Sequence, residues 1–136
     1  MVILGLDIGE KRIGIAKSDA LGMFAHGMEF IERTEDNTHF EKIQACIDEH
    51  SVEKIIVGMP INLDGSEGLA AEHMRGFIEI MKDHVSVPIE TWDERLTSKE
   101  AMRYMQDSSL SGSKKRKRVD SLAAQIMLQN YLDSNL

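Results

Sequence analysis

The sequence predicts an α/β protein built on a mixed five-stranded sheet with helices on both faces. Apolar stretches at residues 2–7, 13–16 and 23–31 are joined by short turns, which favours an antiparallel meander at the start. Helix-like and strand-like segments alternate after residue 38, which is typical of βαβ units. No linker or internal repeat divides the 136 residues, so we expect one domain over residues 1–136.

The first predicted strand ends in a carboxylate. Residues 2–6 are apolar or glycine, as in a strand buried on both faces, and Asp7 follows them directly. Desolvating an isolated carboxylate is costly, so a purely structural role does not account for Asp7. We therefore expect Asp7 to serve a functional site at the end of this strand.

The middle of the chain predicts two helices and two strands. A capping box formed by Thr38 and Glu41 begins the first helix, whose apolar face includes Cys46 as a buried small side chain. The further predicted elements are a strand at 54–58, a helix at 69–82 and a strand at 88–92.

The last third of the chain predicts two further helices separated by a polar loop. A second capping-box pattern, Thr97 with Glu100, begins a helix that we expect to end near Gln106. The segment 107–118 is polar and rich in glycine and serine, which predicts a loop. Apolar residues at helical spacing predict the final helix over about 119–133.

Composition limits the classes of function. No apolar run approaches the ~20 residues of a membrane span, and we expect no secretion signal. A single cysteine cannot form an internal disulfide, so a cytoplasmic protein is expected. Residues 114–118 supply five of the 16 basic residues, and the net charge of −7 becomes −12 without them. This distribution disfavours a general nucleic-acid binder and indicates one local basic segment.

Acidic residues occupy positions where strands end or a helix begins. Asp93 and Glu94 end the last strand, and Asp120 opens the final helix beside its apolar side. Because ligands bind at the carboxyl ends of parallel strands, Asp7 meets this pair if the first and last strands run parallel. Clustered carboxylates repel unless a cation neutralises them, and oxygen ligands favour Mg²⁺ or Mn²⁺ in a two-metal phosphodiester site.

Each acid also has a simpler interpretation. Asp120 can serve the macrodipole of its helix. Asp93 or Glu94 can be an exposed loop acid or the partner of Arg95. Asp7 has the weakest structural explanation, because a buried strand end is an unusual place for a charge without a function.

Four blocks of the sequence resemble the YqgF (RuvX) family. They are LGLDIGEKRIGIAKSD, VGMPINLDGSEG, TWDERLTSKEA and RVDSLAAQIMLQNYLD, and together they extend over nearly the whole chain. The family is described as Holliday junction resolvases and as nucleases of pre-16S ribosomal RNA. The resemblance implies a ribonuclease H-like fold and metal-dependent cleavage of nucleic-acid phosphodiesters.

The resemblance also implies roles for individual acids. Asp7, Glu94 and Asp120 become the catalytic and metal-binding triad, and Asp93 is the alternative to Glu94. In a site with two Mg²⁺ or Mn²⁺ ions, Asp7 is expected to bridge the ions, with Glu94 and Asp120 holding one each.

Basic and polar residues near these acids are the expected contacts to nucleic acid. Residues 114–118 precede Asp120 directly, so we expect them to hold phosphates beside the acids, and a solvated loop is the alternative. The predicted nucleic-acid-binding residues are Lys11, Arg12, Arg95, Lys114, Lys115, Arg116, Lys117 and Arg118. Asn62, Asp64 and Gly65 predict a tight turn, which either is only a turn or forms one wall of the crevice.

The preferred function is a metal-dependent endonuclease that matures the 5′ end of pre-16S rRNA. Alternatives are a Holliday junction resolvase acting on branched DNA and a non-catalytic module that binds nucleic acid or protein. A sugar-kinase or actin-like ATPase is disfavoured, because that fold needs a second domain and a second phosphate loop. A resolvase that cuts two strands symmetrically requires a two-fold dimer, whereas an RNA-processing enzyme can act as a monomer, so both states remain open.

Overall fold

The computed structural model describes residues 1–96 and 112–135, and at residues 96 and 112–120 it describes the backbone alone. The strands are β1 (Val2–Ile8), β2 (Arg12–Ser18), β3 (Ala25–Glu32), β4 (Val52–Met59) and β5 (Ile89–Asp93). The helices are α1 (Thr38–His50), α2 (Leu69–Lys82), the 3₁₀ helix η1 (Glu94–Leu96) and α4 (Gly112–Ser134).

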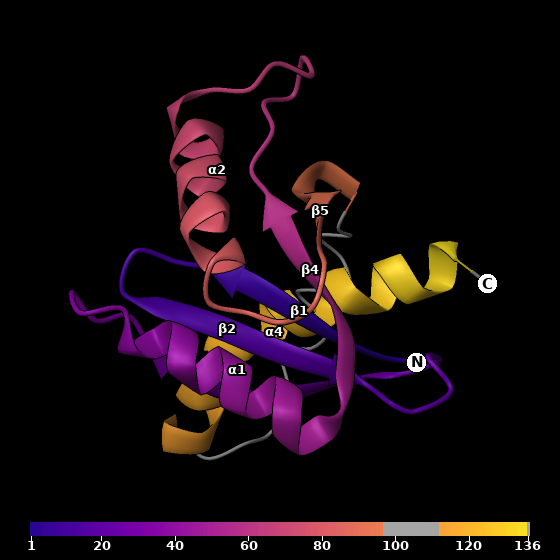
Figure 1. Cartoon of the computed structure of the whole chain (residues 1–136). Helices are drawn as coiled ribbons and strands as arrows, with labels where there is room; N and C mark the ends of the chain where they lie inside the picture. Colours follow the sequence, from indigo (N-terminus) through magenta and orange to yellow (C-terminus); the bar gives the residue numbers. More distant parts are fainter. Residues whose placement is uncertain (97–111, 136) are drawn as a thin grey trace.

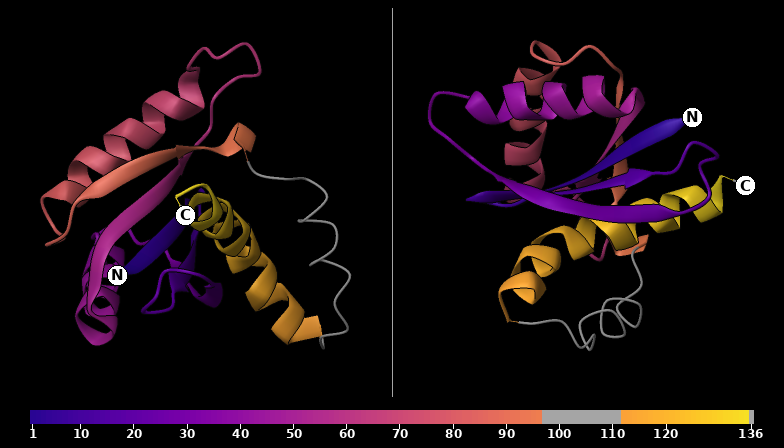
Figure 2. Two further views of the ribbon diagram at one scale, coloured as in Figure 1. Left: turned by 90° about the vertical axis from the view of Figure 1, so that its right-hand side faces the viewer. Right: turned by 90° about the horizontal axis from the view of Figure 1, so that it is seen from below.

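The five strands form one mixed sheet in the order β3-β2-β1-β4-β5. β1, β2 and β3 pair antiparallel, as the short turns predict, whereas β4 lies parallel to β1, and β5 lies parallel to β4. The carboxyl ends of β1, β4 and β5 therefore meet at one edge of the sheet. α1 and α2 cover one face and α4 crosses the other, so the predicted fold class is confirmed (Figures 1 and 2).

Aliphatic and aromatic side chains fill the face of the sheet under α1 and α2. Leu4 and Leu6 of β1 are fully buried there, together with Phe40 of α1 and Met81 of α2. In β1, Leu4 and Leu6 alternate with Ile3 and Gly5, which lie on the opposite face of the sheet, because successive side chains of a strand point to opposite sides.

Small residues line the face of the sheet under α4. A Cβ atom added to Gly5 would lie 3.0 Å from the Leu128 Cβ, and one added to Gly27 would lie 3.1 Å from the Gln125 Oε1. Ala16 of β2 is also fully buried on this face. The backbone of α4 therefore approaches the strands closely, which larger side chains would prevent.

Two polar side chains of α4 fasten it to β2, β3 and the neighbouring loop. The Ser121 hydroxyl accepts a hydrogen bond from the Ile15 amide (3.3 Å) and donates one to the Met28 carbonyl. Gln129 accepts from the Ala25 amide at 2.9 Å and donates to the Met23 carbonyl at 2.9 Å. These bonds fix the helix across the meander.

Two helix starts differ from their predictions. The capping box at Thr38 is wrong: the N-cap is Asn37, with a φ of 63° and no side-chain capping bond. Asp36 instead accepts hydrogen bonds from the Thr38 amide (3.1 Å) and hydroxyl (2.6 Å). The final helix begins at Gly112, so the predicted loop over 107–118 is wrong for residues 112–118.

Other predictions have mixed outcomes. The helix predicted over 69–82 agrees with α2, and α1 begins at Thr38. Cys46 is only half-buried, because it lies at the margin of the apolar face of α1. The helix predicted from Thr97 to Gln106, with its capping box, lies outside the described residues. Within the described part of the chain, no helix has the length and apolar character needed to cross a membrane.

Candidate active site

Asp7 lies on the α4 face of the sheet, at the carboxyl end of β1. Side chains alternate between the two faces along β1, so Asp7 lies on the same face as Gly5, which packs closely against Leu128 of α4. The parallel register pairs Leu6 with Val57, which brings Asp7 beside Gly58 of β4. Gly58 in turn pairs with Trp92 of β5. Asp7 and the residues after β5 therefore flank the same glycine.

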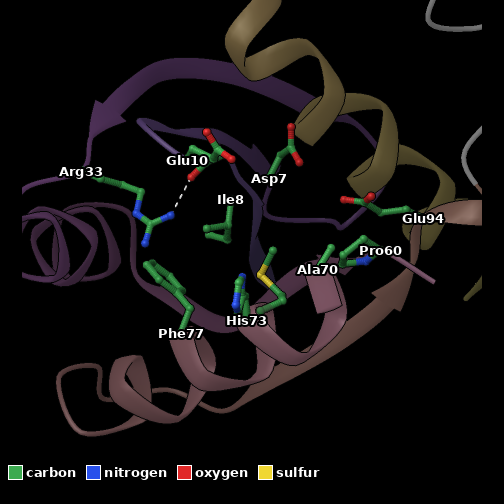
Figure 3. Close-up of a pocket in the computed structure, with 11 residues that line it drawn as sticks. Asp7, Ile8, Glu10, Arg33, Pro60, Ala70, His73, Phe77 and Glu94 are labelled. Carbon is green, nitrogen blue, oxygen red and sulfur yellow. Dashed lines mark hydrogen bonds between the residues drawn. The ribbon is translucent and has the colours of Figure 1, made fainter. Parts of the chain in front are cut away.

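Glu94 occupies the space that Gly58 leaves open. η1 begins at Glu94, directly after β5. A Cβ atom at Gly58 would lie 2.7 Å from the Glu94 Oε1 and 3.1 Å from its Cγ. The absence of a side chain at Gly58 thus allows the Glu94 carboxylate to turn back over β4. Glu94 and Asp7 consequently line one end of a shared pocket (Figure 3).

Ionisation of the Asp7 and Glu94 carboxyl groups is less favourable in the pocket than in water. Burial raises the pKa of Asp7 above its ordinary value. Burial also raises the pKa of Glu94, and the charges of Asp7 and Asp93 raise it further. Among the described residues, neither carboxylate has a basic partner. The pair is therefore electrostatically uncompensated, which is the condition that a bound cation relieves.

Asp93 differs from its neighbour Glu94, because it is paired. Its Oδ2 lies 2.6 Å from Arg95 Nη2 and 2.9 Å from Arg95 Nε. This guanidinium lowers the pKa of Asp93, and the Asp93 carboxylate raises the pKa of Arg95. Arg95 also donates a hydrogen bond to the Leu63 carbonyl at 3.4 Å. The geometry therefore favours Glu94 over Asp93 as the partner of Asp7.

The pocket has a volume of about 510 Å³ and opens at the carboxyl ends of β1 and β4. Its lining residues are Asp7, Ile8, Gly9, Glu10, Arg33, Pro60, Ala70, His73, Met74, Phe77 and Glu94. Arg33 and His73 were not among the residues singled out from the sequence. Both are single residues on surface segments, and only the tertiary packing of α2 and of the segment after β3 beside the β1–β2 turn brings them into the pocket.

The other predicted contact residues lie outside this pocket. Lys11 is exposed in the β1–β2 turn, and the Arg12 guanidinium lies over the Phe30 ring at 5.0 Å. The predicted turn after β4 is present: Asp64 accepts a hydrogen bond from the Ser66 amide at 2.9 Å, and Gly65 has a φ of 89°. Asn62, Asp64 and Gly65 do not line the pocket, to which this loop contributes Pro60.

The third predicted acid and the basic run are described by their backbone alone. The prediction that Asp120 opens the final helix is wrong: α4 begins at Gly112, so Asp120 lies inside the helix, one residue before the anchored Ser121 and beyond the first turn where the macrodipole acts. Lys114, Lys115, Arg116, Lys117 and Arg118 lie in the first turns of the same helix. Among the described side chains, no group of three or more His, Cys, Asp or Glu residues forms a metal site. The described part of the site therefore supplies two of the three predicted ligands.

A divalent cation fits the chemistry of Asp7 and Glu94. Both supply carboxylate oxygens, the ligands that Mg²⁺ and Mn²⁺ prefer. Burial raises the pKa of Asp7, and burial together with the charges of Asp7 and Asp93 raises the pKa of Glu94; a bound cation would offset both effects. The residues present therefore fit the metal that the sequence implies.

The mixed sheet in the order β3-β2-β1-β4-β5, with Asp7 near the end of β1 and Glu94 directly after β5, has a ribonuclease H-like fold. RuvC of Thermus thermophilus, solved with a Holliday junction substrate, has the same fold with a TM-score of 0.61 and 13% identity, covering 99% of this chain and 96% of RuvC. The Holliday junction resolvase of fowlpox virus has a TM-score of 0.56 and 12% identity, covering 98% of this chain and 99% of the resolvase. At these identities the likeness concerns the fold alone.

The chain belongs to the RuvX family, described as Holliday junction resolvase, whose family model matches residues 1–134. A relative from Halothermothrix orenii is 46% identical over 98% of this chain and 95% of its own length. A relative from Desulforamulus reducens is 43% identical over 98% of both chains. Both carry the name "Putative pre-16S rRNA nuclease".

Proposed function

We propose that this RuvX-family chain is a metal-dependent nuclease in which Asp7 and Glu94 hold the divalent cation. The observation that carries the proposal is the pair of half-buried carboxylates with raised pKa values at one end of a pocket. Such a pair is costly to the metal-free fold, so its presence is best explained by a ligand with positive charge. Asp120 is proposed as the third ligand from its place in α4.

Each residue of the proposed site has a distinct task. Asp7 is fixed by its place in β1, which is hydrogen-bonded to β2 on one side and to β4 on the other. Glu94 is held over Gly58 by the short turn of η1. When bound between them, Mg²⁺ or Mn²⁺ supplies Lewis-acid polarisation of a phosphodiester. The Arg95–Asp93 pair braces the turn that carries Glu94.

We propose precursor 16S rRNA, cut at its 5′ end, as the preferred substrate. This rests on the names of relatives with more than 40% identity over almost the whole chain. The description of the family favours branched DNA as a second candidate. The two candidates also differ in assembly, because symmetric cutting of a junction needs a two-fold dimer and RNA trimming does not.

The test is a cleavage assay on a precursor 16S rRNA fragment and a synthetic four-way junction, run side by side with Mg²⁺ or Mn²⁺. Asp7→Asn and Glu94→Gln remove one charge each without changing side-chain size. We expect each to lower the cleavage rate at least about 100-fold, as for loss of a charged group that stabilises a transition state. Asp93→Asn is the matched comparison, and we expect it to retain activity within roughly tenfold, because Asp93 is already neutralised by Arg95.

The outcomes separate the candidate functions. Faster cleavage of the RNA supports the rRNA assignment, and faster cleavage of the junction supports a resolvase. The protein is a non-catalytic module if the wild type binds nucleic acid as tightly in EDTA as with Mg²⁺, and leaves it uncut when Mg²⁺ or Mn²⁺ is present. Full activity of Asp7→Asn would refute the proposed site.

A further inference from the structure

The end of the pocket opposite Glu94 is formed by Arg33, with Glu10 beside it. Arg33 Nη1 donates a hydrogen bond to the Gly9 carbonyl at 2.8 Å, and the guanidinium carbon lies 4.8 Å from the centre of the Phe77 ring. The Arg33 amide also donates to the Lys11 carbonyl at 2.8 Å. Arg33 is therefore held by the β1–β2 turn and by α2 together, and its charged head has a defined position (Figure 3).

Arg33 has no carboxylate partner among the described residues, although several other basic residues do. Arg75 pairs with Glu67, and Arg95 pairs with Asp93 at 2.6 Å. Arg33 instead uses a carbonyl and an aromatic face, which orient the guanidinium without neutralising it. A fixed, uncompensated guanidinium beside a pocket is the arrangement that binds a phosphate well.

Between Arg33 and the Asp7–Glu94 pair the pocket wall is mixed: Glu10 and Gly9 line it near Arg33, and apolar side chains line its middle. Ile8, Ala70 and Met74 contribute aliphatic or thioether surface, and the imidazole of His73 lies among them. Figure 3 shows Arg33 and Phe77 at one end, Glu94 at the other, and Ile8 and His73 between. The volume of about 510 Å³ lies within the usual range of roughly 300–1,000 Å³ for small-ligand sites.

We propose that this pocket is a nucleotide subsite, in which Arg33 binds the phosphate next to the one that is cut. The scissile phosphate lies at the Asp7–Glu94 end, and one nucleoside lies against Ile8 and Met74. This inference rests on the proposed nuclease function and adds the substrate feature that it requires. The apolar middle accepts a base and sugar, and the charged ends match the two phosphates that flank one nucleoside.

The subsite selects nucleic acid that has an unpaired nucleotide at the cut. A base that remains stacked and paired in a duplex cannot enter a pocket between two protein elements, so it must be single-stranded or displaced. Both a single-stranded rRNA leader and the centre of a branched junction can supply such a nucleotide. Continuous duplex is therefore the expected poor substrate.

The probe for the test is adenosine 3′,5′-bisphosphate, which has two phosphates on one nucleoside and no phosphodiester bond to cleave. Its affinity is measured by calorimetry in the presence of Mg²⁺ and compared with that of adenosine 5′-monophosphate. We expect wild-type protein to bind the bisphosphate at least about tenfold more tightly, because one charged hydrogen-bonded contact is added. Arg33→Gln is expected to remove this difference, and Arg33→Lys to retain part of it.

Arg75→Gln is the matched control, because it also removes one arginine charge, from a position on α2 that does not line the pocket. Its bisphosphate affinity is expected to equal that of the wild type. Equal binding of the two nucleotides by wild-type protein would overturn the proposal, even if Arg33→Gln were too unstable to measure. A bisphosphate preference that survives in Arg33→Gln would overturn it as well.

This test and the cleavage assay fail independently. If Asp7→Asn abolishes cleavage while the bisphosphate shows no preference, the nuclease assignment stands and the nucleotide subsite is wrong. If the preference depends on Arg33 while Asp7→Asn cleaves at the wild-type rate, the subsite stands and the catalytic assignment is wrong.

Discussion

The face of the sheet under α1 and α2 and the face under α4 are packed in different ways. The first is filled by large side chains such as Leu4, Leu6 and Phe40, all essentially buried. The second has Gly5 and Ala16 where the first has leucine and isoleucine, and α4 lies close to the strands. Aliphatic bulk therefore separates the layers on one side, and its absence brings helix and sheet together on the other.

The difference explains where polar groups can be placed. On the α4 face the row Ile3, Gly5 and Asp7 ends in a carboxylate, and Gly58 leaves room for Glu94. On the opposite face of β1 the row Leu4, Leu6 and Ile8 ends beside the apolar middle of the pocket. One strand end thus supplies an acid to one side and an apolar wall to the other.

Deletion of bulk is expected to damage the α1–α2 face most. Leu6→Ala removes a fully buried side chain, so it leaves a cavity and should cost about 2–5 kcal/mol of unfolding free energy. Urea denaturation measures this loss. A cost below about 1 kcal/mol would mean that this face repacks freely, contrary to the description of a close-packed layer.

A single added methyl at Gly58 is expected to disturb function more than stability. The alanine Cβ would lie 2.7 Å from the Glu94 Oε1 and 2.9 Å from the Met127 Sδ, both ends of flexible side chains that can move. Displacing Glu94 should lower Mn²⁺ affinity and cleavage by roughly 10- to 100-fold. Gly76→Ala is the control, because a Cβ there meets nothing within 4 Å. Unchanged affinity in Gly58→Ala would show that Glu94 needs no space at this strand.

Addition of bulk is expected to damage the α4 face. Gly5→Val brings a side chain to within 3.0 Å of the Leu128 Cβ, so α4 must shift at a cost of about 1–3 kcal/mol. Strand propensity alone would make valine more stabilising than glycine here. A net destabilisation therefore indicates the close contact with α4. The double variant with Leu128→Gly, which removes the Leu128 Cβ, should recover part of the loss in a double-mutant cycle. Strictly additive losses would contradict direct contact.

Removing the charge of Asp7 is expected to stabilise the metal-free protein. Because its folded pKa is raised, the folded state retains a proton that the unfolded state releases, and stability falls as pH rises through this window. Asp7→Asn should therefore gain about 0.5–2 kcal/mol at neutral pH in EDTA. The gain should shrink as the pH is lowered towards the ordinary aspartate pKa. Thermal melting at neutral pH and near the ordinary aspartate pKa measures this gain in stability. A lower stability of Asp7→Asn than of the wild type at neutral pH would contradict the burial of an ionised Asp7.

Local patterns were sufficient for the sheet and for part of the site. Short turns between apolar stretches indicated the meander, and the place of Asp7 at the end of a buried strand indicated a candidate site residue, which lines the pocket. α4 begins earlier than predicted, because the helix propensity of the lysine and arginine residues at 114–118 outweighs the loop preference of the serine- and glycine-rich residues before them. Repulsion between neighbouring basic residues costs only a few tenths of a kcal/mol, which helix propensity offsets.

Long-range packing determines the rest of the site. Arg33 becomes a pocket residue only where the loop after β3 meets Phe77 of α2, and no spacing in the sequence indicates that contact. The choice between Asp93 and Glu94 likewise depends on Arg95 and on the open space at Gly58. These features follow from tertiary structure and have no local signature.

The most direct test of the account is calorimetric binding of Mn²⁺ to the wild type, Asp7→Asn, Glu94→Gln and Asp93→Asn. If Asp7 and Glu94 hold the cation, the first two variants should lose at least about tenfold in affinity. Asp93→Asn should bind nearly as well as the wild type, because Asp93 is occupied by Arg95. Wild-type affinity in Glu94→Gln, together with loss of binding in Asp93→Asn, would contradict the account.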